Sequence, residues 1–128
     1  MREIITSDAA PAAIGPYSQA TRAGDFIFTS GQLGMEPGTS ALREGVAAQA
    51  EQAMDNLTAL LAAAGARLDD VMKTTIYLTD MADFQTVNAV YGARFQGAAP
   101  ARSTVQVAAL PRGGLVEIEM IAYHPRNS

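Results

Sequence analysis

The segment at residues 115–123 carries two carboxylates within an alternating apolar pattern. One set of positions is apolar throughout, as on the buried face of a strand: Val116, Ile118, Met120 and Ala122. The other set mixes carboxylates with large apolar side chains: Leu115, Glu117, Glu119, Ile121 and Tyr123. A solvated face seldom holds Leu and Ile, and a closed core does not leave two carboxylates unpartnered. The pattern fits a subunit interface that contains a polar pocket, or a sheet edge with two solvated glutamates.

Arg102 begins the preceding apolar run, directly after Pro100 and Ala101. The planar guanidinium matches the two oxygens of a carboxylate, so this position could bind a carboxylate ligand. The residues taken alone favour a simpler interpretation, an ion pair between Arg102 and Glu117 or Glu119.

Two hydroxyl groups, on Tyr17 and Ser30, stand where loops meet strands. Each could orient a ligand or a water molecule, although Ser30 could equally satisfy a turn. His124 is the only histidine and stands near the C-terminus, so the sequence supports neither a catalytic triad nor a histidine metal site.

Periodicity defines the elements that must position these groups. Strands are expected at 26–29, 71–78, 103–108 and 115–123, with weaker candidates at 4–5 and 18–21. One amphipathic helix is predicted over 43–64, ended by Gly65, and a second begins at Asp80 with a stripe of Phe84, Val87, Tyr91 and Phe95. The turn at 111–114 is interpreted as a hairpin. Two helices and about six strands predict an α+β sandwich with both helices on one face of the sheet.

Length and composition indicate one domain over residues 1–128 with a core of small side chains. The chain is 48% hydrophobic, but 25 residues are alanine and only eight are aromatic. A core of small side chains buries little apolar surface, and association between subunits would bury more.

Charge and cysteine content exclude several classes of protein. The net charge is −4 with a single lysine, which argues against nucleic acid as a partner. The absence of cysteine excludes disulfides and thiolate chemistry. Neither a signal peptide nor a membrane span is indicated, since the longest apolar stretch covers only 59–66, and we expect a cytoplasmic protein.

Several segments together resemble the RidA (YjgF) family of reactive intermediate deaminases. The resemblance runs nearly end to end and is carried by APAAIGPYSQA at 10–20, FTSGQ at 28–32, KTTIYL at 73–78, DFQTVNAVY at 83–91, PARSTVQV at 100–107 and VEIE at 116–119. The segments PARS and VEIE are the most specific of these.

The resemblance implies a chorismate-mutase-like fold assembled as a homotrimer, with sites in clefts between subunits. It also implies hydrolysis of 2-imino acids, formed from 2-aminoacrylate and 2-aminocrotonate, to 2-oxo acids and ammonia without a cofactor. An imine carbon conjugated to a carboxylate is already electrophilic, so this chemistry requires no metal.

Individual roles follow from the resemblance position by position. Arg102 matches the arginine that binds the substrate carboxylate, and Glu117 matches the glutamate that positions or activates water. Tyr17, Ser30 and Gly31 match residues lining the cleft. Thr104, expected among the substrate-binding residues, stands where many relatives have cysteine. If this position contributes mainly its backbone, the threonine is harmless, and if the thiol serves redox regulation in some relatives, that behaviour is expected to be absent here. Two alternatives remain open: a non-catalytic small-molecule-binding or protein-protective member of the same fold, and an enzyme that shares only the chorismate-mutase-like fold.

Overall fold

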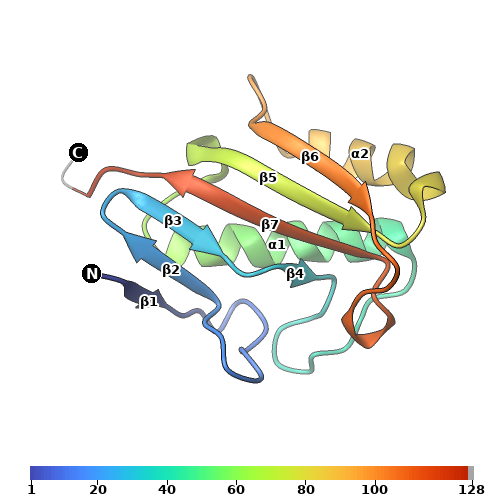
Figure 1. The fold of residues 1–128 in the computed structure, drawn as a ribbon, viewed down its shortest axis with the longest axis horizontal. Coiled ribbons are helices and arrows are strands. Elements are labelled where there is room, and N and C mark those ends of the chain that lie inside the picture. Colours follow the sequence, from blue (N-terminus) through green and yellow to red (C-terminus); the bar gives the residue numbers. More distant parts are fainter. Residues whose placement is uncertain (127–128) are drawn as a thin grey trace.

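In a computed structural model, which describes residues 1–126, seven strands form one sheet and two helices pack against it (Figure 1). The last two residues of the expected 1–128 domain lie outside the described residues. The strands are β1 (Glu3–Ile5), β2 (Ala20–Ala23), β3 (Phe26–Thr29), β4 (Gln32–Leu33), β5 (Val71–Leu78), β6 (Ala101–Gln106) and β7 (Val116–Tyr123). The helices are α1 (Val46–Ala63) and α2 (Phe84–Gly92), with 3-10 turns at Leu68–Asp70, Met81–Asp83 and Pro111–Gly113.

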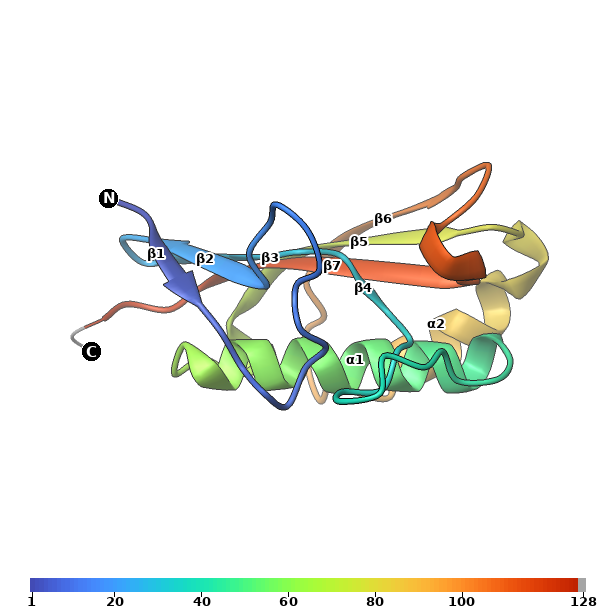
Figure 2. The same cartoon turned by 90° about the horizontal axis from the view of Figure 1, so that it is seen from below.

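The sheet order is β1-β2-β3-β7-β5-β6, with β4 paired to β7 beyond the end of β3. Only β5 and β6 run parallel, and the other pairs are antiparallel. Figure 2 shows both helices on the same side of the sheet, so the expected α+β arrangement is confirmed.

The sheet has one strand more than the six or so expected, because β4, only two residues long, is too short to produce a sequence pattern. One expectation about the connections is wrong. The segment at 111–114 is not a hairpin turn, since β5 lies between β6 and β7. It forms instead the 3-10 turn of a longer connection that passes the end of β5 (Figure 1).

The first helix ends as its sequence predicts. Gly65 adopts a φ of 83°, and the following amide of Ala66 donates to the Leu61 carbonyl over 2.8 Å. The second helix is shorter than expected and ends at Gly92, but the Phe95 ring still packs 4.9 Å from that of Tyr91. Asp80 caps the turn that leads into α2, because its carboxylate accepts from the Ala82 amide over 2.9 Å.

The expected alternation along β7 is confirmed. Its inward side chains are at most 1% exposed: Val116, Ile118, Met120 and Ala122. They pack beneath α1, whose Leu57, Leu60 and Leu61 are fully buried. The opposite face is not covered by helices, so Glu117 and Glu119 lie on the open side of the sheet (Figure 2). No helix within residues 1–126 is both long and apolar enough to cross a membrane.

Arg22 ties three segments of the chain together at one end of the sheet. It is only 5% exposed, and its guanidinium donates to the carbonyls of Gly24 and Ala64, each over 3.0 Å, and to that of His124. These carbonyls belong to the β2–β3 turn, the end of α1 and the residue after β7. One buried side chain therefore holds the helix layer against the sheet.

We expect Arg22→Met to lower the free energy of unfolding by about 3 kcal/mol, because three partly buried carbonyls lose charge-assisted hydrogen bonds worth about 1.5–3 kcal/mol each. Chemical denaturation of both proteins measures the difference. The exposed Arg43 provides the control, since Arg43→Met removes only a 4.0 Å contact with Glu36 and should change stability by less than about 0.5 kcal/mol. Equal effects of the two substitutions would contradict the assigned role of Arg22.

Candidate functional site

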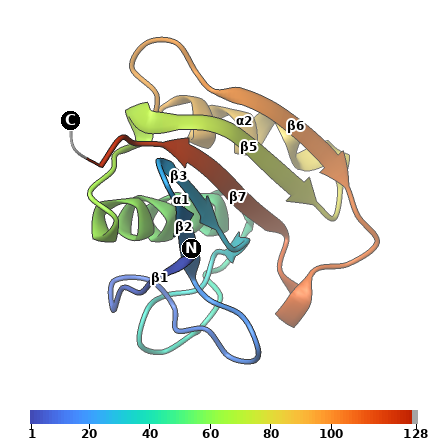
Figure 3. The same cartoon turned by 60° about the vertical axis from the view of Figure 1, so that its left-hand side comes forward.

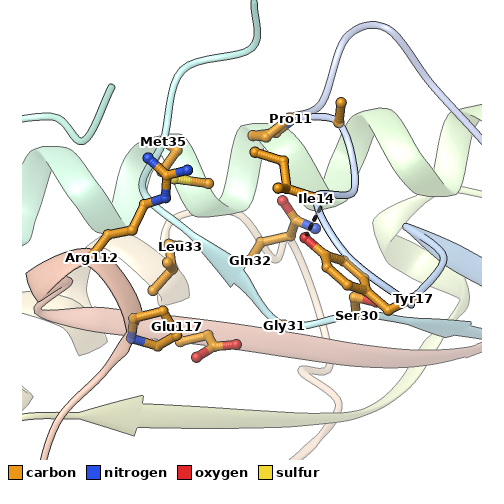
Figure 4. Close-up of a pocket in the computed structure, with 12 residues that line it drawn as sticks. Pro11, Ile14, Tyr17, Ser30, Gly31, Gln32, Leu33, Met35, Arg112 and Glu117 are labelled. Atoms are coloured by element: carbon orange, nitrogen blue, oxygen red, sulfur yellow. Dashed lines mark hydrogen bonds between the residues drawn. The ribbon is translucent and has the colours of Figure 1, made fainter. Parts of the chain in front are cut away.

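A cavity of about 490 Å³ opens beside the end of β7, between the loop before β2, the segment at 30–35 and the turn at 111–113 (Figure 4). All of these segments and β7 contribute side chains to the cavity lining, among them Tyr17, Ser30, Met35, Arg112 and Glu117. Gly31 lines the cavity with its backbone. Four of the residues expected at the site, Tyr17, Ser30, Gly31 and Glu117, are thus brought together within one chain.

Among residues 1–126, Glu117 is the only acidic residue that lines the cavity, and Gly31 makes room for it. A Cβ atom at Gly31 would overlap the Glu117 carboxylate, so any larger residue at position 31 would displace the Glu117 side chain. Burial, and secondarily the negative charge of Glu119, raise the pKa of Glu117 above the ordinary glutamate value. A carboxylate with a raised pKa is a stronger base and suits proton abstraction from water.

The two hydroxyl residues lie beside Glu117. The Ser30 hydroxyl donates to the Ser18 carbonyl, and the Ser30 amide donates to the Gln19 carbonyl over 2.9 Å. The hydroxyl oxygen keeps its acceptor capacity toward the cavity. Tyr17 is 52% exposed, and its hydroxyl oxygen accepts a long 3.4 Å hydrogen bond from the Ile14 amide (Figure 4). The tyrosine hydroxyl proton therefore remains available to a ligand.

Buried amides of α1 hold the opposite wall of the cavity. Asn56 is fully buried and donates to the carbonyls of Leu33 and Met35 over 3.3 and 2.9 Å. Gln49 accepts from the Leu115 amide over 2.9 Å and donates to the Arg43 carbonyl over 3.0 Å. These contacts fix the β4 segment and the start of β7 to the helix layer.

Arg102 and Thr104 lie outside this cavity, on the edge strand β6 beside α2 (Figure 3). The Arg102 guanidinium donates to Asn88 Oδ1 over 2.6 Å and lies 5.5 and 5.2 Å from the ring centroids of Phe84 and Tyr91. The Tyr91 hydroxyl in turn lies 2.7 Å from the Thr74 hydroxyl oxygen. The Thr104 hydroxyl oxygen is buried and has no hydrogen-bond partner among the described residues.

The strand register places Arg102 and Glu117 on opposite faces of the sheet. Arg102 pairs with the buried Thr74, whereas Glu117 pairs with Tyr77, three positions further along β5. Positions three apart on a strand point to opposite faces. The interpretation that Arg102 forms an ion pair with Glu117 or Glu119 is therefore wrong. Its guanidinium contacts the Asn88 side chain and two aromatic rings instead.

Sequence reasoning missed part of the cavity. Arg112 and Met35 were not expected there, because the connection carrying Arg112 was interpreted as a hairpin and Met35 lies in an irregular loop. His124 does not line the cavity, and its Nδ1 lies 3.3 Å from Asp70 Oδ2. Within residues 1–126, His, Asp and Glu side chains form no group of three or more that could hold a metal ion.

Comparison with curated proteins finds relatives along almost the whole chain. A protein named DfrA from Myxococcus xanthus is 56% identical over 124 residues, covering 94% of this chain and 95% of that protein. The mouse protein named 2-iminobutanoate/2-iminopropanoate deaminase is 52% identical over 123 residues, covering 95% of this chain and 91% of its own length.

Solved structures share both the fold and the family. RidA from Psychrobacter sp. PAMC 21119 superposes with a TM-score of 0.92 at 52% identity, covering 94% of this chain and 98% of that one. Escherichia coli TdcF, solved with bound serine, gives a TM-score of 0.92 at 42% identity, covering 95% and 98%. The model of the family described as endoribonuclease L-PSP matches residues 7–124. The chain therefore belongs to this family, the RidA (YjgF) family that its motifs indicate.

Proposed function

We propose that this protein hydrolyses 2-imino acids to 2-oxo acids and ammonia. The observation that carries the proposal is the cavity in which the Glu117 carboxylate, with a raised pKa, faces the hydroxyls of Tyr17 and Ser30. Family membership supports the same reaction, because relatives about half identical to this chain are named for it. The imines derived from 2-aminoacrylate and 2-aminocrotonate are the proposed substrates.

Glu117 acts as the general base in this proposal. The substrate reacts as the imine protonated at nitrogen. Glu117 takes one proton from a water molecule as the water oxygen bonds to the imine carbon and the C=N electron pair moves to nitrogen, which gives a neutral tetrahedral amino alcohol. The carboxylic acid then returns that proton to the nitrogen. The C–N bond breaks as a hydroxyl lone pair forms the carbonyl of the 2-oxo acid, and the hydroxyl proton passes through Glu117 to the departing ammonia, which leaves as ammonium. General-base assistance of this kind contributes about 10²–10⁴ in rate.

Arg102 binds the substrate carboxylate in this proposal. Its contacts with Asn88, Phe84 and Tyr91 hold the side chain in a defined direction and leave further guanidinium N–H groups for a carboxylate. The Gly31 and Thr104 backbones would complete the substrate contacts.

Because the sheet separates Arg102 from Glu117, we place the complete site between two subunits of a homotrimer. The open face of the sheet carries large apolar side chains that are each more than 40% exposed in the single chain: Phe26, Phe28 and Tyr123. Such a patch is typical of an interface. An Arg102 from a neighbouring subunit could then reach the Glu117 cavity.

A small anion suits this site better than a nucleic acid, although the family description names an endoribonuclease. The chain has a net charge of −4 and one lysine, so it lacks the basic surface that a polyanion needs. The TdcF structure, with its bound serine, shows that a family member binds a small carboxylate.

We expect Arg102→Ala and Glu117→Gln each to lower the rate of ammonia release from a dehydratase-generated imine by about 10² or more, because each removes one half of the site. A 1:1 mixture of the two variants, assembled together, should recover activity at about a quarter of the sites, where an intact Arg102 meets an intact Glu117.

The matched control mixes Arg102→Ala with the double variant, which cannot restore any site. Wild-type protein that does no better than the uncatalysed reaction would refute the deaminase proposal itself. Mixed trimers, identified by mass spectrometry, without recovered activity would refute only the site between subunits.

The pH profile provides a separate test. A base with a raised pKa stays protonated, and so inactive, to a higher pH, so kcat/KM should fall on the acid side at a pH above the ordinary glutamate value. Glu119→Gln removes a charge that raises this pKa and should shift the acid limb to lower pH. An unchanged acid limb in Glu119→Gln would contradict the assignment of that limb to Glu117.

A further inference from the structure

Arg112 is the second charged side chain that lines the Glu117 cavity, and the proposed reaction does not use it. Figure 4 shows Arg112 and Met35 on one side of the cavity, with Tyr17 and Ser30 on the other. Arg112 is exposed and forms no hydrogen bond or ion pair with any residue in the described part of the chain. It is therefore free to bind an anion that enters the cavity.

The backbone holds Arg112 in an uncommon conformation. Its φ of 59° and ψ of 18° lie in the left-handed region of backbone conformation, which residues other than glycine, asparagine and aspartate seldom adopt. Residues kept in such conformations cluster at ligand-binding sites. This observation is independent of the side chain's position and points to the same turn.

The turn is anchored firmly enough to position a side chain. A Cβ atom at Gly114 would lie 2.8 Å from Leu33 Cδ2, so the backbone packs directly against the β4 wall. The next amide, of Leu115, donates to the buried Gln49 side chain over 2.9 Å. Arg112 is thus presented from a turn fixed at both the sheet and the helix layer.

We infer that Arg112 recognises a second anionic group on the substrate, so that the preferred substrates include 2-imino acids with a carboxylate in the side chain. This inference rests on the proposed function, in which Arg102 holds the first carboxylate. Glu117 must face the imine carbon, and Arg112 lies across the cavity from Tyr17 and Ser30. A side-chain carboxylate that extends past Glu117 toward Met35 would meet its guanidinium. A cavity of about 490 Å³ is spacious enough for a dicarboxylate of five carbons.

Binding of the stable oxo acids tests this inference without requiring turnover. Calorimetry would compare 2-oxoglutarate, which carries the second carboxylate, with 2-oxobutanoate, which does not. We expect the wild-type protein to prefer 2-oxoglutarate, and Arg112→Gln to lower the ratio of the two affinities by about 10-fold, as loss of a charge-assisted hydrogen bond predicts. Arg112→Lys keeps the charge and should retain most of the preference. Arg67→Gln, at an exposed position outside the cavity lining, removes the same charge and should leave the ratio unchanged.

The outcomes separate this inference from the proposed function. Equal loss of affinity for both oxo acids in Arg112→Gln, or a wild-type protein that does not prefer 2-oxoglutarate, would overturn the role of Arg112. An Arg112-dependent preference in a protein that hydrolyses no imine would support that role and refute the deaminase activity. Where imine hydrolysis is measurable, we compare kcat/KM for the five-carbon dicarboxylic imine with kcat/KM for 2-iminobutanoate. This ratio should fall about 10-fold in Arg112→Gln, as the affinity ratio of the two oxo acids does.

Discussion

The sheet of this protein has one face covered by helices and one open face, and this difference decides what each charged group can reach. Alternation along β5 places Thr74 beneath α2 and Tyr77 on the open side. The neighbouring strands follow the same rule, so Arg102 lies with Thr74 and Glu117 with Tyr77. A shift of β7 by one residue would turn Glu117 and Glu119 toward the helices and bury their charges in the core. The separation is therefore as firmly fixed as the core itself.

The carboxylate of Glu117 is held where ionisation is disfavoured. For a carboxyl group whose folded pKa is raised, the protonated form contributes stability below the unfolded pKa, and this contribution is lost as pH rises through the folded pKa. Above the folded pKa, the ionised carboxylate thus lowers the free energy of unfolding. The contacts of the buried Arg22, at the other end of the sheet, and of the buried Asn56, which fixes the cavity wall, offset this cost.

Sequence patterns predicted what depends on local periodicity. The boundaries of the strand at 71–78, the faces of β7 and the Gly65 stop all follow from neighbouring residues, and the structure agrees. The family motifs likewise brought Tyr17, Ser30, Gly31 and Glu117 to one cavity. What escaped prediction depends on strand order. The position of β5 between β6 and β7 decides both the path of the Arg112 turn and the direction of Arg102, and no local pattern encodes strand order.

The last of the described strands, β7, occupies the centre of the sheet, between β3 and β5. A ribosome releases β7 after the six other described strands, so the nascent chain cannot close this core before β7 has emerged. Pairing of β3 with β7 joins segments almost a hundred residues apart, which makes the folding nucleus non-local and folding slow for a chain of this size. The same late strand delivers Glu117. The cavity and the core are therefore completed in one step, and a chain that stops before β7 has neither.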